Sequence, residues 1–255
     1  MRFSRRRFLK RGLIAGPVCF GGVVVEAMCI EPEWLKIERI RVGAGGIKII
    51  HFTDLHFKGD AAYLHRVVET INGENADLVC FTGDAVEEAE YFAPALEILK
   101  GVKSPLYGIP GNHDFWARAD FRLAREKLSA QGGRWLMDES AIALNGRVKL
   151  HGVTGGKPPL WELAEHGPNI LLSHYPNWIE RIHGVKFDLI LSGHSHGGQV
   201  RLPGIGALLT PSGVGKFEIG MFQTPAGPMY VNPGIGYFYA NVRFCCRPEI
   251  TVFEV

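Results

Sequence analysis

The sequence has few cysteines, and they are poorly placed for structural chemistry. Its five cysteines include no CxxC pair and no spacing typical of a disulfide framework. Cys80 lies inside the apolar run Leu78–Phe81, and Cys245 and Cys246 are adjacent near the C-terminus. We therefore expect neither a disulfide-stabilised scaffold nor a thiolate zinc site, and we expect Cys80 to pack as a small buried hydrophobe.

A strong charge of one sign is also missing. The formal net charge is +2 over 255 residues, and basic side chains gather within the first 11 positions. The rest of the chain is close to neutral and carries no basic stripe of the kind that binds nucleic acid, so no nucleic-acid partner is expected. With 46% hydrophobic and 21% charged residues, the composition is that of an ordinary globular protein with one large domain.

The apolar run near the N-terminus is too short to cross a membrane comfortably. It extends from Gly12 to Val25, whereas a spanning helix needs about 20 residues. The preceding segment Ser4-Arg5-Arg6-Arg7-Phe8-Leu9-Lys10 resembles a twin-arginine export signal. No Ala-x-Ala cleavage site follows, so an uncleaved anchor or a basic arm on the membrane surface stays open. We expect residues 1–33 to be a signal or membrane anchor and residues 34–255 to be one domain.

Beyond the leader, apolar runs alternate with stretches of helical spacing. The patterns predict strands at 47–53, 77–82, 105–109, 141–144, 148–153, 169–172 and 188–191, and helices at 61–71, 89–99, 120–130 and 176–182. Continuous apolar runs suit strands buried on both faces, and the Pro- and Gly-rich tail from Gly197 suits antiparallel hairpins. The expected fold class is α/β, with helices packed outside a sheet core.

Polar clusters follow five of the predicted strands. They are Asp54-Leu55-His56, Gly83-Asp84, Gly111-Asn112-His113-Asp114, Ser173-His174 and Gly193-His194-Ser195-His196. Ligand sites in α/β sheets form beyond the carboxyl ends of the strands. If all five clusters meet there, one pocket receives carboxylates, an amide and several imidazoles.

This mixture of oxygen and nitrogen donors suits two divalent cations. A carboxylate shared between ions about 3.5–4 Å apart lowers their repulsion, and neutral imidazoles complete the coordination without adding negative charge. The absence of thiolates favours Mn, Fe, Zn or Co. A single Asp-x-His or Gly-Asp is common in turns and helix caps, but turns and caps do not account for five clusters in order at strand ends.

With these motifs the chain resembles the calcineurin-like metallophosphoesterase family, over about residues 47–198. The segment Gly193-His194-Ser195-His196-Gly197-Gly198-Gln199 is similar to one found in a small bacterial branch of that family. The resemblance implies a layered α/β/β/α sandwich and a phosphate or pyrophosphate ester as substrate. It implies that one metal is held by Asp54, His56 and His196, that the other is held by Asn112, His174 and His194, and that Asp84 bridges them.

The resemblance also implies a mechanism. A hydroxide that bridges the metals would attack phosphorus, and His113 would donate a proton to the leaving alkoxide. Asp114 would orient the ring of His113. No serine or cysteine nucleophile is then required, because metal-bound water ionises near neutral pH.

The location of the domain decides between two substrate classes. A domain exported by the twin-arginine signal would meet phosphodiesters or nucleotides of the cell envelope. A domain anchored on the cytoplasmic face of the bacterial inner membrane would resemble enzymes of lipid A synthesis that cleave UDP-2,3-diacylglucosamine, a lipid-linked nucleotide. An apolar anchor would place such an enzyme at the interface where acyl chains partition.

Two further classes of function stay open. A non-catalytic scaffold of the same fold would lack metal ligands or His113, and a two-metal peptidase would use a similar site. The remaining histidines are expected to be packed or solvated; they are His51, His65, His151, His166 and His183. The loop 154–161 and the aromatic pair Tyr237 and Phe238 could border the substrate cleft.

Overall fold

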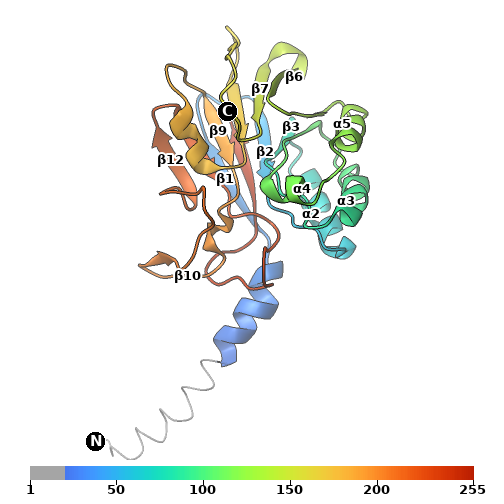
Figure 1. Ribbon diagram of the computed structural model, residues 1–255, viewed down its shortest axis with the longest axis vertical. Helices are drawn as coiled ribbons and strands as arrows, with labels where there is room; N and C mark the ends of the chain where they lie inside the picture. Colours follow the sequence, from blue (N-terminus) through green and yellow to red (C-terminus); the bar gives the residue numbers. More distant parts are fainter. Residues whose placement is uncertain (1–20) are drawn as a thin grey trace, which may run out of the picture.

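Two six-stranded sheets form the centre of the molecule (Figure 1). The structure is a computed structural model that describes residues 21–255. The first sheet has the order β1 (Lys36–Arg41), β14 (Glu249–Glu254), β2 (Lys48–Phe52), β3 (Leu78–Phe81), β4 (Leu106–Gly108) and β5 (Arg134–Trp135). Strands β2 to β5 are parallel, and β14 pairs antiparallel with β2.

The second sheet, like the first, consists mainly of parallel strands. Its order is β12 (Gly220–Thr224), β13 (Gly227–Val231), β9 (Leu189–Ser192), β8 (Asn169–Ser173), β7 (Val148–Val153) and β6 (Glu139–Ala143). The four inner strands are parallel, and the edge strands β12 and β6 are antiparallel to their neighbours. Parallel neighbours bring the carboxyl ends of β8 and β9 to the same edge.

Helices cover the outer face of the first sheet, on the right of Figure 1. They are α2 (Ala61–Gly73), α3 (Phe92–Leu99) and α5 (Phe121–Ser129), and the short α4 (Asn112–Trp116) lies near them. Helix α2 starts because the Asp60 side chain accepts from the Tyr63 amide. Its buried side chains recur at helical spacing, so one face packs on the sheet; they are Leu64, Val67, Val68 and Ile71.

Alternation along the strands divides the core into layers. Ile49 faces the second sheet, where it packs with Leu172 and Leu191, whereas Ile50 faces the helices. A third apolar cluster lies on the outer face of the second sheet under the 3-10 segment η5 (Pro176–Arg181). The expected α/β class with helices outside the sheets is therefore confirmed, and a single 3-10 segment stands where a helix was predicted at 176–182.

Smaller elements connect these layers. They are η1 (Glu26–Ile30), η2 (Glu31–Glu33), η3 (Ala89–Tyr91), η4 (Leu144–Gly146), η6 (His196–Gly198) and the hairpin of β10 (Arg201–Leu202) and β11 (Gly206–Ala207). The twin-arginine-like segment and most of the predicted anchor lie outside residues 21–255. Among these residues, no helix is both long and apolar enough to cross a membrane. The domain boundary at residue 33 stays a prediction.

Candidate metal centre

Each of the five polar clusters begins at the end of a strand or within three residues after it. Strands β2, β3 and β4 end at Phe52, Phe81 and Gly108, and β8 and β9 end at Ser173 and Ser192. The clusters therefore come from three strands of the first sheet and two of the second. Because these strands are parallel within each sheet, their carboxyl ends place the clusters in one buried pocket between the sheets.

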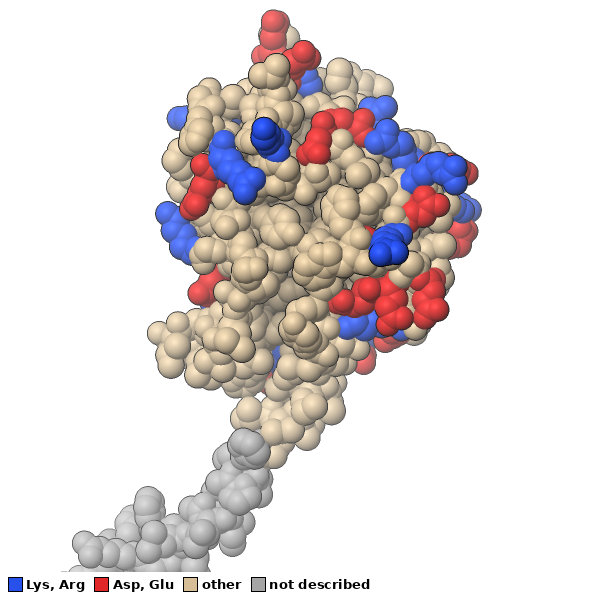
Figure 2. All heavy atoms as spheres, viewed as in Figure 1, with Lys and Arg blue, Asp and Glu red and all other residues tan. Residues whose placement is uncertain are grey.

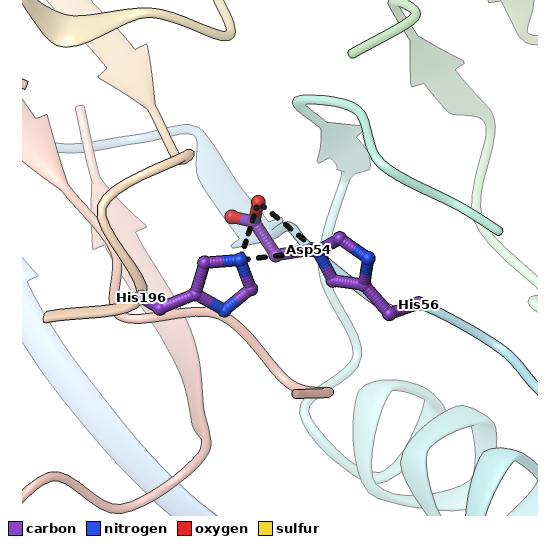
Figure 3. A group of neighbouring side chains, drawn as sticks. All are labelled: Asp54, His56 and His196. Carbon is purple, nitrogen blue, oxygen red and sulfur yellow. Dashed lines mark hydrogen bonds and ion pairs between the residues drawn. The ribbon is translucent and has the colours of Figure 1, made fainter. Parts of the chain in front are cut away.

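Three side chains from distant segments point toward one another in Figure 3. The Nε2 atoms of His56 and His196 are 3.0 Å apart. Asp54 Oδ1 lies 3.9 Å from His56 Nε2 and 3.5 Å from His196 Nε2. Two imidazole nitrogens and one carboxylate oxygen thus face a common point, which is the donor set expected for the first metal.

A second group lies on the other side of Asp84. His174 Nε2 is 3.0 Å from Asn112 Oδ1 and 3.1 Å from His194 Nδ1. Asp84 Oδ2 is 3.2 Å from His174 Nε2 and 3.7 Å from His56 Nε2. One carboxylate oxygen therefore faces both groups, as a bridging ligand must.

The two carboxylates are each anchored through one oxygen and left without a hydrogen bond at the other. Asp54 Oδ2 accepts from the His194 amide and Asp84 Oδ1 from the His113 amide, at 2.9 and 2.8 Å. Their partner oxygens, Asp54 Oδ1 and Asp84 Oδ2, are buried and have no hydrogen-bond donor among the described residues. A buried carboxylate oxygen without a donor is costly, and a cation at each group would satisfy it.

The imidazoles are also prepared for metal binding. His174 Nδ1 donates to the Thr82 carbonyl oxygen at 2.7 Å, and His194 Nε2 donates to the Ser212 carbonyl oxygen at 2.7 Å. These bonds aim the opposite nitrogen of each ring at the group. Because the pKa of His174 is about 9, a metal would displace the second proton of that ring when it binds. Burial lowers the pKa of His194 to about 4, so this ring stays neutral.

The electrostatic field of the pocket favours a cation. Burial raises the pKa of the Asp54 carboxyl, and the nearby charge of Asp84 raises it further. Burial alone would lower the pKa of His174, but the Asp84 carboxylate raises it to about 9. The carboxylates therefore draw positive charge into the pocket, and divalent cations would supply that charge.

The backbone at the ligands adopts an uncommon conformation. Five of the seven predicted ligands have positive φ, between 41° and 65°; they are Asp54, His56, Asp84, His194 and His196. Residues other than glycine rarely have positive φ, and clusters of non-glycine residues with positive φ are typical of functional sites. Close packing also requires Gly111, because a Cβ there would overlap the Asp84 carboxylate and amide. The turns thus aim the side chains at the cost of local strain.

His113 is held by a residue that the sequence motifs did not identify. Its Nδ1 lies 2.8 Å from Glu87 Oε2, while Glu87 Oε1 lies 2.5 Å from Nδ1 of the ligand His56. Burial lowers the pKa of His113, but the hydrogen bond to Glu87 and the negative charges of Asp84 and Glu87 together raise that pKa above its ordinary value. Glu87 stands beside Glu88 in the sequence, and no pattern separates the two.

Asp114 is predicted to orient the ring of His113, but its hydrogen bonds go to backbone amides. Its carboxylate accepts from the backbone amides of Gly111, Asp84 and Ala85 at 2.8 to 2.9 Å. It makes no hydrogen bond to the His113 ring among the described residues, and Glu87 takes that place. Asp114 follows a turn that points its side chain back to the loop after β3, so it fixes the two loops against each other.

Aromatic side chains border the site beside His113. Its ring meets Trp116 and Phe238 edge to face, both at 4.6 Å between centroids. Trp116 is 69% exposed, so its indole is free to contact a substrate. The prediction that Phe238 borders the cleft agrees with this contact. Of the other histidines, His51 and His151 are buried in the core, and His65, His166 and His183 are exposed.

The chain belongs to the calcineurin-like phosphoesterase family, and its match to that family spans residues 47–198. It is 32% identical to the metallophosphoesterase YkuE of Bacillus subtilis, with 100% of this chain and 98% of that protein covered. It is 28% identical to the phosphodiesterase YaeI of Escherichia coli, with 99% of each covered. It is 26% identical to the UDP-2,3-diacylglucosamine pyrophosphatase LpxG of Chlamydia trachomatis, with 95% of this chain and 94% of that protein covered.

Family and geometry agree. The protein is a metal-dependent phosphoesterase of a family that uses two divalent metals, and its donor groups fit two such ions. The predicted family, enzyme class and cofactors are confirmed.

Proposed function

We propose that the chain hydrolyses phosphodiesters or pyrophosphate esters at the paired donor groups. The observation that carries the proposal is the position of Asp84 Oδ2, buried, without a donor, and within 3.7 Å of a histidine of each group. Asp54, His56 and His196 would hold one cation, and Asn112, His174 and His194 the other. When bound, the two cations supply a nucleophilic water at neutral pH and neutralise charge on the phosphoryl oxygens.

The protein's own groups then complete the reaction. His113 Nδ1 donates to Glu87, and its Nε2 makes no hydrogen bond to any described residue. A protonated Nε2 can therefore pass its proton to the oxygen of the leaving group. The ring lies 4.9 Å from that of the ligand His56, between centroids, so the proton would be held beside the proposed metal centre. Trp116 and Phe238 pack edge to face against the ring of His113 on this side.

A leaving-group comparison tests this function. His113→Ala should lower turnover of an alkyl diester by about 10²–10⁴-fold, because a poor leaving group needs a proton. It should lower turnover of an activated aryl diester far less. Steady-state kinetics on both esters measure the ratio, with the exposed His65→Ala as control. Equal losses on the two esters would contradict the assignment.

A lipid-linked nucleotide is a second candidate substrate. Two observations favour it: the aromatic border beside His113, and the similarity to LpxG along nearly the whole chain. An aromatic border suits a nucleoside or an acyl chain. Turnover of UDP-2,3-diacylglucosamine by the full chain, compared with a water-soluble diester, distinguishes the two; failure on the lipid with turnover of the diester would exclude this candidate.

We also propose that the enzyme works at the inner membrane of a bacterium. The support is the basic segment followed by the apolar run from Gly12 to Val25. The domain would lie on the exported face if the twin-arginine signal is used, and otherwise on the cytoplasmic face. No nucleic-acid partner is proposed.

A further inference from the structure

A long part of the C-terminal half carries almost no charge. The sequence has no Lys, Arg, Asp or Glu from Leu202 to Gly215, nor from Ile219 to Val242. The first of these segments forms the β10–β11 hairpin and the chain after it. Its turn and exit expose three large apolar side chains, Ile205, Leu208 and Leu209, of which Leu209 is 83% exposed. Clustered apolar side chains on the surface of a soluble domain mark an interaction site.

A second exposed apolar group lies at the start of the described chain. Val25, Met28 and Ile30 each have about half of their surface exposed, between 50% and 54%. They belong to the helical segment that ends in η1 (Glu26–Ile30). We refer to these three residues together with Ile205, Leu208 and Leu209 as the apolar face.

Hydrogen bonds connect the hairpin and the N-terminal segment, the two halves of the apolar face, through the short segment 243–245. The Arg201 amide at the base of the hairpin donates to the Phe244 carbonyl oxygen at 2.9 Å. On either side of Phe244, the Arg243 amide donates to the Ala27 carbonyl oxygen and the Cys245 amide donates to Glu31 Oε2. The hairpin and the N-terminal segment are therefore fixed at the same end of the molecule, where Figure 1 also places them.

Charge is distributed away from this end. Figure 2 shows Lys, Arg, Asp and Glu side chains mainly over the upper part of the molecule and along both of its sides. The lower end, over the hairpin and the beginning of the described chain, is mostly uncharged in that view. Arg201 at the base of the hairpin is paired with Glu218 at 3.1 Å, so it adds no free charge.

The sequence just before residue 21 indicates which partner covers the apolar face. Immediately before residue 21 the sequence is apolar from Gly12, and before that it is basic, with Arg5, Arg6 and Arg7. An apolar run flanked by basic residues suits a bilayer with anionic headgroups better than it suits another protein. We propose that the apolar face rests on the membrane and that the hairpin inserts beside the N-terminal segment as a second contact.

This contact would set the orientation of the enzyme. The segment that joins the two halves continues back to Phe238, which packs against His113. Gln199, just before the hairpin, accepts from the Phe238 amide at 3.2 Å and donates to the Val242 carbonyl oxygen at 2.8 Å. The border of the metal centre is therefore tied to the membrane contact, and a substrate at the bilayer surface would approach from that side.

Partition of the full chain into lipid vesicles tests the proposal. The triple variant Ile205→Ser, Leu208→Ser and Leu209→Ser should partition at least tenfold more weakly than wild type into phosphatidylcholine vesicles with or without phosphatidylglycerol, because three apolar side chains no longer enter the lipid. Leu209→Ser alone should weaken partition about threefold or more. The matched control is Ile142→Ser, since Ile142 is 70% exposed on β6, far from the hairpin.

Two results would overturn the proposal. One is partition of the triple variant within twofold of the control. The other is a loss of self-association in detergent, measured by light scattering, with unchanged partition, since the face would then join two copies of the chain. Turnover of a soluble diester shows that the variants fold, and it reports the proposed function separately, because the inference does not depend on which ester is cleaved.

Discussion

At the level of single residues, Glu87 contacts both a predicted metal ligand, His56, and the proposed proton donor, His113. One of its oxygens meets a ligand of the first metal and the other meets the proposed acid. Residues that orient a metal-binding imidazole commonly change metal affinity by 10–100-fold when they are replaced. The carboxylate would therefore act on both the metal and the proton.

Replacing Glu87 tests this link. In Glu87→Gln the amide can accept from only one imidazole and presents N–H groups to the other. We expect about 10–100-fold weaker binding of one metal and a loss of turnover that is larger for poor leaving groups. Titration calorimetry with Mn²⁺ and the kinetics of both esters measure these effects.

The neighbouring Glu88 provides the control. It is exposed and has no contact with the site among the described hydrogen bonds and ion pairs. Glu88→Gln should behave as wild type, and a Glu87 variant that is indistinguishable from it would remove Glu87 from the mechanism.

Motifs predicted residues at this scale only where the spacing was distinctive. The seven ligand positions lie in Asp-x-His, Gly-Asp, Gly-Asn-His-Asp, Ser-His and Gly-His-x-His, the motifs that carry the family resemblance, and the structure gathers all of them. Glu87 was missed because its role comes from the turn after β3, which no local pattern encodes. The orienting role of Asp114 stays a prediction. Its carboxylate accepts from backbone amides here, because the direction of a side chain after a turn depends on what packs against it.

At the level of elements, the loops after the strands carry the precision of the site. Gly111 immediately precedes α4 and lies against the loop that holds Asp84. Five ligands with positive φ sit in such loops. The strands supply the position, and these strained turns supply the direction of each side chain.

Adding one methyl group at Gly111 tests whether its loop packs closely against the loop that holds Asp84. In Gly111→Ala the new Cβ would overlap the Asp84 carboxylate and amide, so we expect a loss of about 1–3 kcal/mol in the free energy of unfolding. Metal binding should also weaken. Urea unfolding of the metal-free chain and metal titration measure the two effects.

Gly73→Ala is the matched substitution. Gly73 ends α2, has open space around it and lacks a positive φ, so the change should be within about 0.5 kcal/mol or stabilising. If Gly111→Ala were equally harmless, the loops would not be in contact as described.

Periodicity predicted seven strands and three helices within a few residues, including β2, β3, β8 and β9, which position the ligands. It missed the short β5, and it missed β1 and β14, whose residues Lys36 and Glu249 pair across 213 positions. It also missed α4, because the helix begins inside the polar motif Gly111–Asp114. Strand partners are set by tertiary packing and not by local preference, so the tail hairpin could be predicted while the parallel pairing of β13 with β9 could not.

At the level of the whole molecule, we propose that the N-terminal segment decides where the enzyme works. The basic motif lies outside the described residues, so its role stays a prediction. Its Arg5-Arg6 pair is the feature that twin-arginine export would read, and the described chain begins at the apolar face.

A conservative change at that pair tests export. Arg5→Lys together with Arg6→Lys keeps the charge and removes the arginines, so export should be blocked and the protein should accumulate inside the cell. Arg2→Lys with Arg11→Lys is the control of equal charge. Cell fractionation measures the result, and a double variant that fractionates like wild type would show that the segment is an anchor alone.

The central claim is that two cations share Asp84, and anomalous diffraction from crystals grown with Mn²⁺ tests it most directly. We predict two anomalous peaks about 3.5–4 Å apart, one among Asp54, His56 and His196 and the other among Asn112, His174 and His194, with Asp84 Oδ2 between them. In crystals of Asp84→Ala both peaks should be absent or strongly weakened. A single peak in the wild type, or two full peaks in the variant, would contradict the account.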